Sequence, residues 1–390
     1  MLRFISLTAL CAVTASSAYA GGWETGKLDT SFLYESGNYA EFSYGNLDYS
    51  IEGTTQAGVT HKMAKDQTRV SVSGKFNLGR LEIGISSFDS GAIQMDGQSA
   101  ASNRATCATA AQAVGGGNLA QVPNMTQNCS IVASADANLD TQAIIAKYKV
   151  NDNFSFIGGL RHVKLANSTV GTVRTDYSIN SNSETGAIYG VAYARPDIAL
   201  RLELVHSAAQ KMKLSGTASG LMAAALGNNV PFADSSELNV PKAMTLKFQT
   251  GIAKDTLLMA SVHRVDWKAA QIDVNFAGQA AALDVASDFS DTTAYSIGLG
   301  RKFTENTSGS ISYSWEDGAG ATSTSGFTMS NGSKTISLGL KHKLDNVTIS
   351  GGVSYTEVGD VNVASSSGLL TSGYSNNSVT ALGFKIGYNF

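Results

Sequence analysis

The chain ends with the stretch LGFKIGYNF, residues 382–390. Apolar residues occupy every second position of this stretch, and they are Leu382, Phe384, Ile386, Tyr388 and Phe390. Because side chains of a strand have a period of two, these residues share one face, and the other face carries glycine, lysine and asparagine. Lipid would cover such an apolar face in a membrane barrel, whereas a soluble protein would need another layer of chain. The stretch therefore predicts an all-β fold, namely a transmembrane antiparallel up-and-down β-barrel.

Both ends of the chain indicate export. The terminal aromatic strand resembles the sorting signal that outer-membrane barrels present to the barrel-assembly machinery, through Phe390. Residues 1–20 are predicted to be a signal peptide, with a basic start, an apolar stretch at residues 4–13 and a small-x-small site before Gly21. That apolar stretch is far shorter than the ~20 residues of a spanning helix. We expect the outer membrane of a Gram-negative bacterium, where lipid and lipopolysaccharide surround the protein.

The composition suits such a barrel. The chain has 390 residues with 40 Gly, 4 Pro, 15% charged residues and a mean hydropathy of -0.02. A barrel averages a lipid-facing surface and a wet surface to a value near zero. Removal of Arg3 with the signal peptide leaves 27 basic against 31 acidic residues, so 27 - 31 gives a charge of -4. This acidic balance argues against nucleic acid as a partner.

Alternating segments predict one barrel domain. We expect the signal peptide at 1–20, a short N-terminal plug at 21–38 and the barrel at 39–390. The connections alternate between tight polar turns and long loops, as in outer-membrane barrels. A short helix is expected at 220–227. The alternation predicts about fourteen strands, with both chain ends on the periplasmic side, at residues 39–51, 68–76, 80–88, 141–150, 154–165, 186–194, 198–212, 243–252, 256–272, 291–303, 308–315, 334–344, 347–355 and 378–390.

Two cysteines remain after removal of the signal peptide. Cys107 and Cys129 lie in one long polar segment of an exported chain. A disulfide between them is the expectation for an oxidising compartment, and two free thiols are the alternative.

Parity along the predicted strands places a set of basic side chains on the inner wall. Arg161, Arg201 and Lys247 have inward parity and are accompanied by few carboxylates, chiefly Glu203. One hypothesis is that at least one of these cations attracts the anionic headgroup of a ligand. The alternative is that all three pair with Glu203 or with acidic residues of the plug.

Three stretches resemble the FadL family of outer-membrane transporters for long-chain fatty acids and other hydrophobic compounds. Residues 186–201 look like the sixth strand, turn and seventh strand of that family. Residues 240–244 resemble the beginning of its eighth strand, and residues 256–267 resemble its ninth strand. The plug departs from the family pattern, because it is short and lacks the Asn-Pro-Ala motif.

The resemblance implies passive uptake with lateral release. A hydrophobic groove on the extracellular loops would catch the ligand, and its candidates here are Leu221, Met222, Leu226 and Phe232, together with Val230. An inward kink in the third strand would then open the wall, with Gly84 and Gly91 as candidate kink points. The alternative for the groove candidates is that they only pack the loop.

Other functions have less support. The five histidines lack metal-ligand spacing, and neither Gly-x-Ser-x-Gly nor a P-loop occurs. We therefore expect no catalysis, no cofactor and no metal, and a monomer. A general diffusion porin for small hydrophilic solutes is the main alternative, although the strand count is below sixteen and the predicted third loop, residues 166–182, is short. A structural or adhesive barrel is a third class.

Overall fold

The structure is a computed structural model. It describes residues 22–55, 60–96, 134–171, 175–220, 229–274, 289–318, 320, 322–323, 327–364 and 370–390. The predicted signal peptide, Cys107, Cys129 and the predicted helix at 220–227 lie wholly or almost wholly outside these residues.

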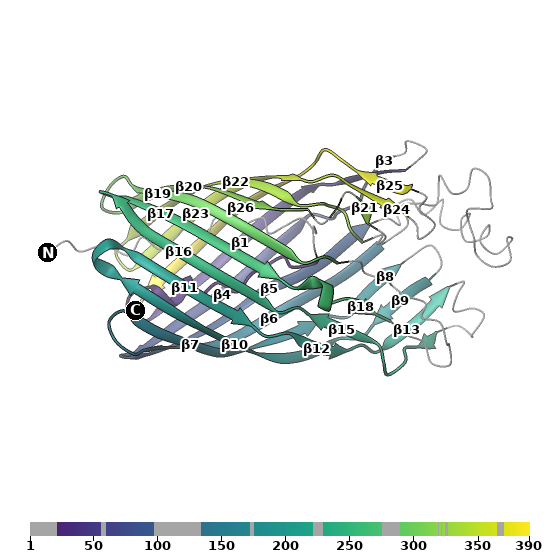
Figure 1. Ribbon diagram of the computed structural model, residues 1–390, viewed down its shortest axis with the longest axis horizontal. Coiled ribbons are helices and arrows are strands. Elements are labelled where there is room, and N and C mark those ends of the chain that lie inside the picture. Colours follow the sequence, from purple (N-terminus) through teal and green to yellow (C-terminus); the bar gives the residue numbers. More distant parts are fainter. Residues whose placement is uncertain are drawn as a thin grey trace.

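Fourteen antiparallel strands form a closed barrel (Figure 1), which confirms the predicted fold and strand count. Closure is made by β1 and β26, whose ladder runs without interruption from Tyr39–Asn389 to Ser50–Ser378. In chain order the barrel strands are β1 (Tyr39–Ser50), β4 (Gln67–Leu78), β5 (Leu81–Asp96), β6 (Ser134–Lys149), β7 (Phe154–Leu165), β10 (Asn182–Arg195), β11 (Leu200–Ser207), β16 (Ala243–Ala253), β17 (Thr256–Val265), β19 (Thr292–Lys302), β20 (Thr307–Glu316), β22 (Ser333–Leu344), β23 (Val347–Val358) and β26 (Asn377–Asn389).

The two faces of the wall follow the predicted parity. On β6, Ile144 is 52% exposed while its neighbour Ile145 is 0% exposed. Val72, Tyr189, Leu202 and Ile336 are exposed on the outer surface in the same way. The cations predicted to face inward, such as Lys75, Lys147 and Arg201, are buried. The outer face of the strands is therefore apolar, and the inner face carries the charged side chains together with a cluster of apolar ones.

Tight turns join strands at one end of the barrel. Gly79, Asp255 and Asp345 adopt φ values of 80°, 58° and 49° in three of these turns. The turn before β11 is the 3-10 helix η4 (Pro196–Ile198), after which Ala199 has a φ of 54°. Glycine and short polar residues tolerate this left-handed region best, which explains Gly79, Asp255 and Asp345 but not Ala199.

Two predicted strands end earlier than expected. The segment predicted at 198–212 is divided into η4, β11 and β12 (Gln210–Lys213). The ladder between β11 and β16 stops at Ser207–Ala243, shortly after Pro241 in the chain, which lacks the N–H that a ladder needs. The segment predicted at 256–272 leaves the barrel after Val265 and continues as the 3-10 helix η5 (Trp267–Ala269), with the Trp267 side chain buried.

Shorter strands extend the far end of the barrel, away from the C-terminus (Figure 1). No helix in the described part of the chain is long and apolar enough to cross a membrane. The additional strands are β2 (Glu52–Thr55), β3 (Thr60–Lys62), β8 (Ser168–Gly171), β9 (Thr175–Ile179), β13 (Gly216–Gly220), β14 (Val230–Pro231), β15 (Glu237–Val240), β18 (Ile272–Asp273), β21 (Thr322–Ser323), β24 (Val361–Ala364) and β25 (Leu370–Tyr374).

The chain before β1 lies inside the barrel. We call residues 22–38 the N-terminal segment; it contains the 3-10 helix η1 (Ser31–Tyr34). Asp29 starts this turn, because its carboxylate accepts hydrogen bonds from the Ser31 amide at 3.0 Å and the Ser31 hydroxyl at 2.6 Å. Phe32 and Leu33 then point into an apolar cluster of inward residues that includes Ile145 and Ile188.

Candidate functional site

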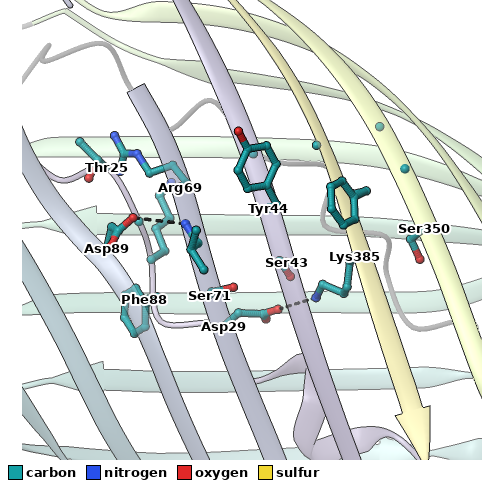
Figure 2. Close-up of a pocket in the computed structure, with 18 residues that line it drawn as sticks. Thr25, Asp29, Ser43, Tyr44, Arg69, Ser71, Phe88, Asp89, Ser350 and Lys385 are labelled. Atoms are coloured by element: carbon teal, nitrogen blue, oxygen red, sulfur yellow. Dashed lines mark hydrogen bonds and ion pairs between the residues drawn. The ribbon is translucent and has the colours of Figure 1, made fainter. Parts of the chain in front are cut away.

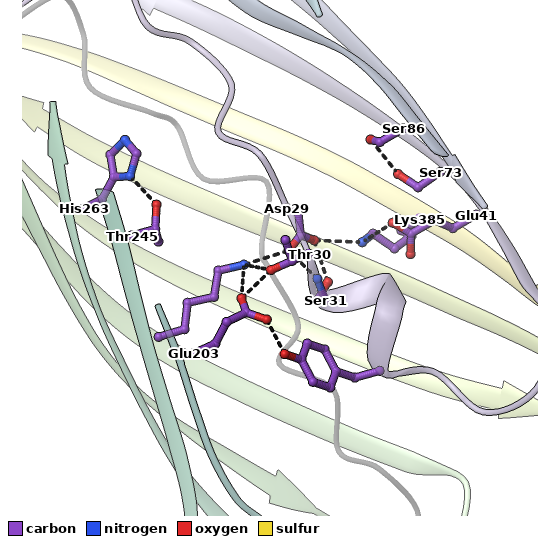
Figure 3. A network of polar contacts seen from close by, with 12 residues as sticks. Asp29, Thr30, Ser31, Glu41, Ser73, Ser86, Glu203, Thr245, His263 and Lys385 are labelled. Atoms are coloured by element: carbon purple, nitrogen blue, oxygen red, sulfur yellow. Dashed lines mark hydrogen bonds and ion pairs between the residues drawn. The ribbon is translucent and has the colours of Figure 1, made fainter. Parts of the chain in front are cut away.

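Charged residues of the barrel hold the N-terminal segment at Asp29 (Figure 3). Nζ of Lys247 lies 3.1 Å from Asp29 Oδ1, and Nζ of Lys385 lies 3.9 Å from Asp29 Oδ2. Burial alone would raise the pKa of the Asp29 carboxyl, but Lys247, Lys385 and Ser31 outweigh it and hold that pKa well below its ordinary value. Asp29 therefore stays ionised and links two opposite parts of the wall, β16 and β26.

A second anchor is Glu203 of β11. Its carboxylate accepts hydrogen bonds from the Thr30 hydroxyl and the Tyr34 hydroxyl, and Lys247 Nζ lies 3.9 Å from it. Glu203 is 1% exposed, so these charge-assisted bonds form away from water. The carboxylate that sequence parity singled out thus serves to dock the N-terminal segment.

A third anchor lies around Glu82 of β5. Nζ of Lys147 and Nζ of Lys149 lie 2.5 Å and 2.8 Å from the Glu82 carboxylate, and Lys75 lies 3.7 Å from it. Lys147 also donates to the carbonyl of Leu33 at 2.8 Å, and Lys75 donates to the carbonyl of Glu35. The backbone carbonyls of Leu33 and Glu35 are therefore bound to the wall by two lysines that both contact the Glu82 carboxylate.

Gly84 permits the close contact between η1 and β5. A Cβ at Gly84 would lie 2.5 Å from Leu33 Cδ2 and 2.6 Å from Phe32 Cε2. Phe32 and Leu33 are each 0% exposed. Together with the three anchors, these side chains fill the barrel at the level of η1.

The other end of the N-terminal segment docks through Trp23 and Glu24. Glu24 Oε2 lies 2.8 Å from Nε2 of His263 on β17, and Nδ1 of that ring lies 2.8 Å from the Thr245 hydroxyl. Burial would raise the pKa of the Glu24 carboxyl, but His263 above all, with Lys27 and Arg161, holds it below its ordinary value. Glu24 is thus an ionised group beside Trp23, whose ring is 2% exposed.

The wall itself is interrupted between β4 and β5. Their ladder ends at the Ser71–Phe88 pair, although β4 continues to Gln67 against β1 and β5 continues to Asp96 against β6. A register shift between Asp89 and Gly91 leaves Ser90 as an extra residue in β5, which is the geometry of a β-bulge. We call the divergence beyond Ser71–Phe88 the wall break.

The N-terminal segment covers the edge of β5 at the wall break. The Thr25 amide donates to the Ser90 carbonyl at 3.0 Å, and the Ala92 amide donates to the Trp23 carbonyl at 2.9 Å. Glu24 and Gly91 form an antiparallel bridge between these bonds. Backbone groups of β5 that no longer pair with β4 thus form hydrogen bonds with the N-terminal segment, which is not part of the barrel. Because this segment could move away, the edge of β5 is a suitable place for an opening.

A cavity of about 180 Å³ adjoins the wall break (Figure 2). We call it the wall cavity. Its lining includes Arg69 and Val70 of β4, Phe88 and Asp89 of β5, and Thr25, Gly26, Lys27 and Asp29 of the N-terminal segment. Gly45, Gly383 and Gly352 line its far side, and they are cross-strand neighbours on β1, β26 and β23. The space exists because three adjacent strands lack side chains at this level.

A second cavity, of about 30 Å³, lies on the other side of Trp23. We call it the apolar cavity. Its lining includes Trp23, Ile93, Ala137, Tyr177, Leu238 and Phe327, and no charged side chain lines it. Trp23 is the one residue of the N-terminal segment in this lining, whereas Thr25, Gly26, Lys27 and Asp29 line the wall cavity. The segment therefore separates the two cavities.

The three cations predicted to attract a ligand all contact protein groups. Arg161 donates to the carbonyls of Ala208 and Pro241 at 2.8 Å and 3.0 Å. The Arg201 guanidinium lies over the Tyr34 ring, 4.1 Å from its centre, and Lys247 contacts Asp29 and Glu203. Lys247 thus pairs with Glu203 and a carboxylate of the N-terminal segment, as the alternative has it, whereas Arg161 contacts carbonyls and its buried Nε has no hydrogen-bond partner among the described residues.

The remaining predicted residues are placed as follows. Gly91 adjoins the register shift, and a Cβ there would lie 2.9 Å from the Trp23 carbonyl, whereas Gly84 lies in a regularly paired part of β5. Phe232 packs against the buried apolar cluster that contains Tyr177, which we call the upper core. Its ring centre lies 6.3 Å from that of Tyr177. Leu221, Met222 and Leu226 lie outside the described residues, so the groove remains a prediction.

Sequence reasoning missed the residues that define the two cavities. Trp23 and Glu24 follow no alternating pattern, and Ser90 has no distinctive residue type. The sequence did offer one signal for this docking site, because parity places the imidazole of His263 on the inner wall, where a side chain of the N-terminal segment can bind it. Among the described residues, no group of three or more His, Cys, Asp or Glu side chains could hold a metal ion.

Comparison with known proteins gives structural likeness at low sequence identity. No family model matches the sequence, and no curated protein matches it at a significant level. The crystal structure of a Pseudomonas aeruginosa FadL homologue matches with a TM-score of 0.69 and 12% identity, over 92% of each chain. The P. putida toluene transporter TodX matches with a TM-score of 0.61 and 14% identity, over 95% of this chain and 96% of that one. The Ralstonia pickettii toluene transporter TbuX matches with a TM-score of 0.60 and 12% identity, over 97% and 98%. The chain thus has a FadL-like fold.

Proposed function

We propose that the protein is a non-enzymatic transporter of the Gram-negative outer membrane for passive uptake of long-chain fatty acids or other hydrophobic small molecules. The ligand would leave sideways through the wall break into the membrane. We take the protein to be a monomer surrounded by lipid and lipopolysaccharide and inserted by the barrel-assembly machinery.

The observation that carries the proposal is the wall break, with its bulge at Ser90 and the adjoining wall cavity. A cavity of about 180 Å³ exceeds the ~150 Å³ that is enough to bind benzene in an apolar protein interior. It is bounded on the lumen side by the N-terminal segment and lies where β4 and β5 no longer pair. A ligand that reaches this space would meet the bilayer once the segment's backbone bonds to β5 are displaced, in the stretch between the Ser71–Phe88 pair and the bridge of Ala64 to Met95.

The filled lumen at the level of η1 supports lateral release over passage to the periplasm. Phe32, Leu33 and the anchors at Glu203, Glu82 and Asp29 occupy the route along the barrel axis. A water-filled pore would also offer nothing to an apolar molecule, whereas an apolar site removes it from water at about 0.8 kcal/mol per methylene. The same filling disfavours the diffusion-porin alternative.

The comparisons support the substrate class in a coarse way. The structures most like this chain include transporters described as carrying toluene and a homologue of FadL. At this low identity the likeness concerns the fold alone, so the identity of the ligand is our own proposal.

Two measurements test this function, one on the purified full-length protein and one in cells that express it. In planar bilayers we expect no large stable channel, and in cells we expect expression to speed the uptake of an uncharged hydrocarbon above the vector control. Large stable channels with unchanged hydrocarbon uptake would support the porin instead.

A further inference from the structure

We propose that the transported ligand is uncharged, so that the protein discriminates against carboxylates such as fatty-acid anions. This inference rests on the proposed function and narrows its substrate class.

The apolar cavity offers nothing to a negative charge. None of its lining residues is charged, and apart from Ser168 the lining consists of aliphatic or aromatic side chains such as Ile93, Leu238 and Phe327. A carboxylate without a counter-charge or hydrogen-bond donors is strongly disfavoured in such surroundings. An alkyl chain or an aromatic ring gains its full transfer free energy there.

The inward cations are committed to other partners. Arg161 holds two backbone carbonyls, Arg201 lies over Tyr34, and Lys247 neutralises Asp29 and Glu203. None of the three lines either cavity. A ligand carboxylate that reached Lys247 would have to break its ion pairs and leave a buried carboxylate without its partner, and this loss would offset the new ion pair.

The charged group that follows Trp23 in the chain is a carboxylate, and His263, Lys27 and Arg161 lie around it. Glu24 follows Trp23 directly and is held ionised by His263. In a low-dielectric interior this carboxylate repels a second negative charge over several ångströms. In the wall cavity, Lys27, Arg69 and Lys385 face Asp29 and Asp89, so that space also lacks a purely positive surface.

The small size of the apolar cavity also favours an uncharged ligand. Its volume of about 30 Å³ is well below the ~150 Å³ that holds benzene, so a ligand must enlarge it. Trp23 is the one lining residue that belongs to the N-terminal segment rather than to the barrel or its extracellular strands. Displacement of this ring adds space that is again bounded by apolar groups.

The test compares two ligands with one carbon chain, dodecanoate and its methyl ester. Binding at pH 8 is measured to full-length protein in nanodiscs, with empty nanodiscs subtracted. We expect the ester to bind at least about tenfold more tightly than the anion, because only the anion requires burial of a charge. We also expect Gln in place of Arg161, Arg201 or Lys247 to leave this ratio unchanged.

Two variants of β6 locate the ligand. Ala137→Phe fills the apolar cavity and should abolish ester binding, whereas Ala146→Phe, on the same strand with outward parity, should leave it unchanged. Equal or tighter binding of dodecanoate would overturn the inference while leaving hydrophobic uptake intact. Ester binding that survives in a folded Ala137→Phe protein would also overturn it. If neither ligand binds, the proposed function fails as well. The ratio of the two affinities in the wild type decides the inference even where a variant does not fold.

Discussion

The carbonyl oxygen of Trp23 accepts a hydrogen bond from the amide of Ala92 at 2.9 Å, on the edge of β5 that β4 has left. This bond joins the side chain that separates the two cavities to the strand that interrupts the wall. A movement of Trp23 would therefore strain or break this hydrogen bond at the wall break.

Gly84→Leu should undock the N-terminal segment and open the lumen to ions. The new side chain would occupy the place of Phe32 and Leu33, and the strand that carries it is fixed by β4 and β6. Single-channel conductance in planar bilayers measures the effect. Gly158→Leu is the matched control, because a Cβ at Gly158 meets nothing within 4 Å. Indistinguishable conductance of the two variants would show that the segment does not close the lumen.

Asp29→Asn should loosen the segment at neutral pH. Since the pKa of the folded carboxyl lies below its unfolded value of 3.8, its stabilisation is complete above that value and is lost as the pH falls towards the folded pKa. Trypsin cleavage after Lys27, the one basic residue of the segment, reports docking. We expect cleavage of the variant to be at least about tenfold faster at pH 7, with the loss of charge-assisted bonds as the reason.

In the wild type, the resistance of the N-terminal segment to trypsin should be the same at every pH from 8 down to 5. Trypsin loses activity in acid, so the lower pH range is read by hydrogen exchange of the Thr25 and Ser31 amides, both of which are hydrogen-bonded. Release of the wild-type segment already near pH 6 would contradict the assigned role of Asp29.

The parity of the strands could be predicted from sequence because lipid and lumen select opposite residue types. The change of face within β5 could not. Ile83 and Ile85 face outward below the bulge, whereas Ile93 and Met95 face inward above it, and all four share odd numbers. An uninterrupted alternation thus hides the bulge, since lipid below and the upper core above both select apolar side chains.

The candidate cations illustrate a second limit. Their inward parity was predicted correctly for Arg161, Arg201 and Lys247, but parity says nothing of what enters the barrel. The partners of Arg201 and Lys247, which are Tyr34 and Asp29, lie far away in sequence, on a segment without periodic pattern. Only the docked position of this segment distinguishes a ligand-binding cation from an anchoring one.

Cys107 and Cys129 should form a disulfide in the second extracellular loop. The oxidising environment of an exported protein favours the bond, and the closed loop would gain roughly 3 kcal/mol in the chain-entropy model. Mass mapping of peptides prepared without reduction checks it. Recovery of both cysteines as free thiols would exclude the bond.

Phe390→Ala should slow assembly of the barrel. The Phe390 ring contacts Tyr388 with centres 6.1 Å apart and Phe76 of β4 with centres 6.5 Å apart, at the seam where β26 meets the first strands. Appearance of the heat-modifiable folded form after a pulse of synthesis measures assembly. Phe303→Ala removes an equally exposed ring away from the seam and serves as the control. Equal assembly rates for both variants would exclude a special role of Phe390.

Deletion of Ser90 tests lateral release most directly. Without this extra residue the register of β5 becomes continuous, and Gly91, Ile93 and Met95 keep their inward faces, so the barrel can fold while β5 follows β4 and closes the wall break. Ser90→Ala keeps the bulge and removes only the hydroxyl contacts to Leu139 and Thr141. The measurement is the rate of uptake of an uncharged hydrocarbon by cells with equal amounts of folded barrel. We predict that the deletion reduces uptake to the vector level and that Ser90→Ala transports like the wild type; wild-type uptake by the deletion variant would contradict release through the wall between β4 and β5.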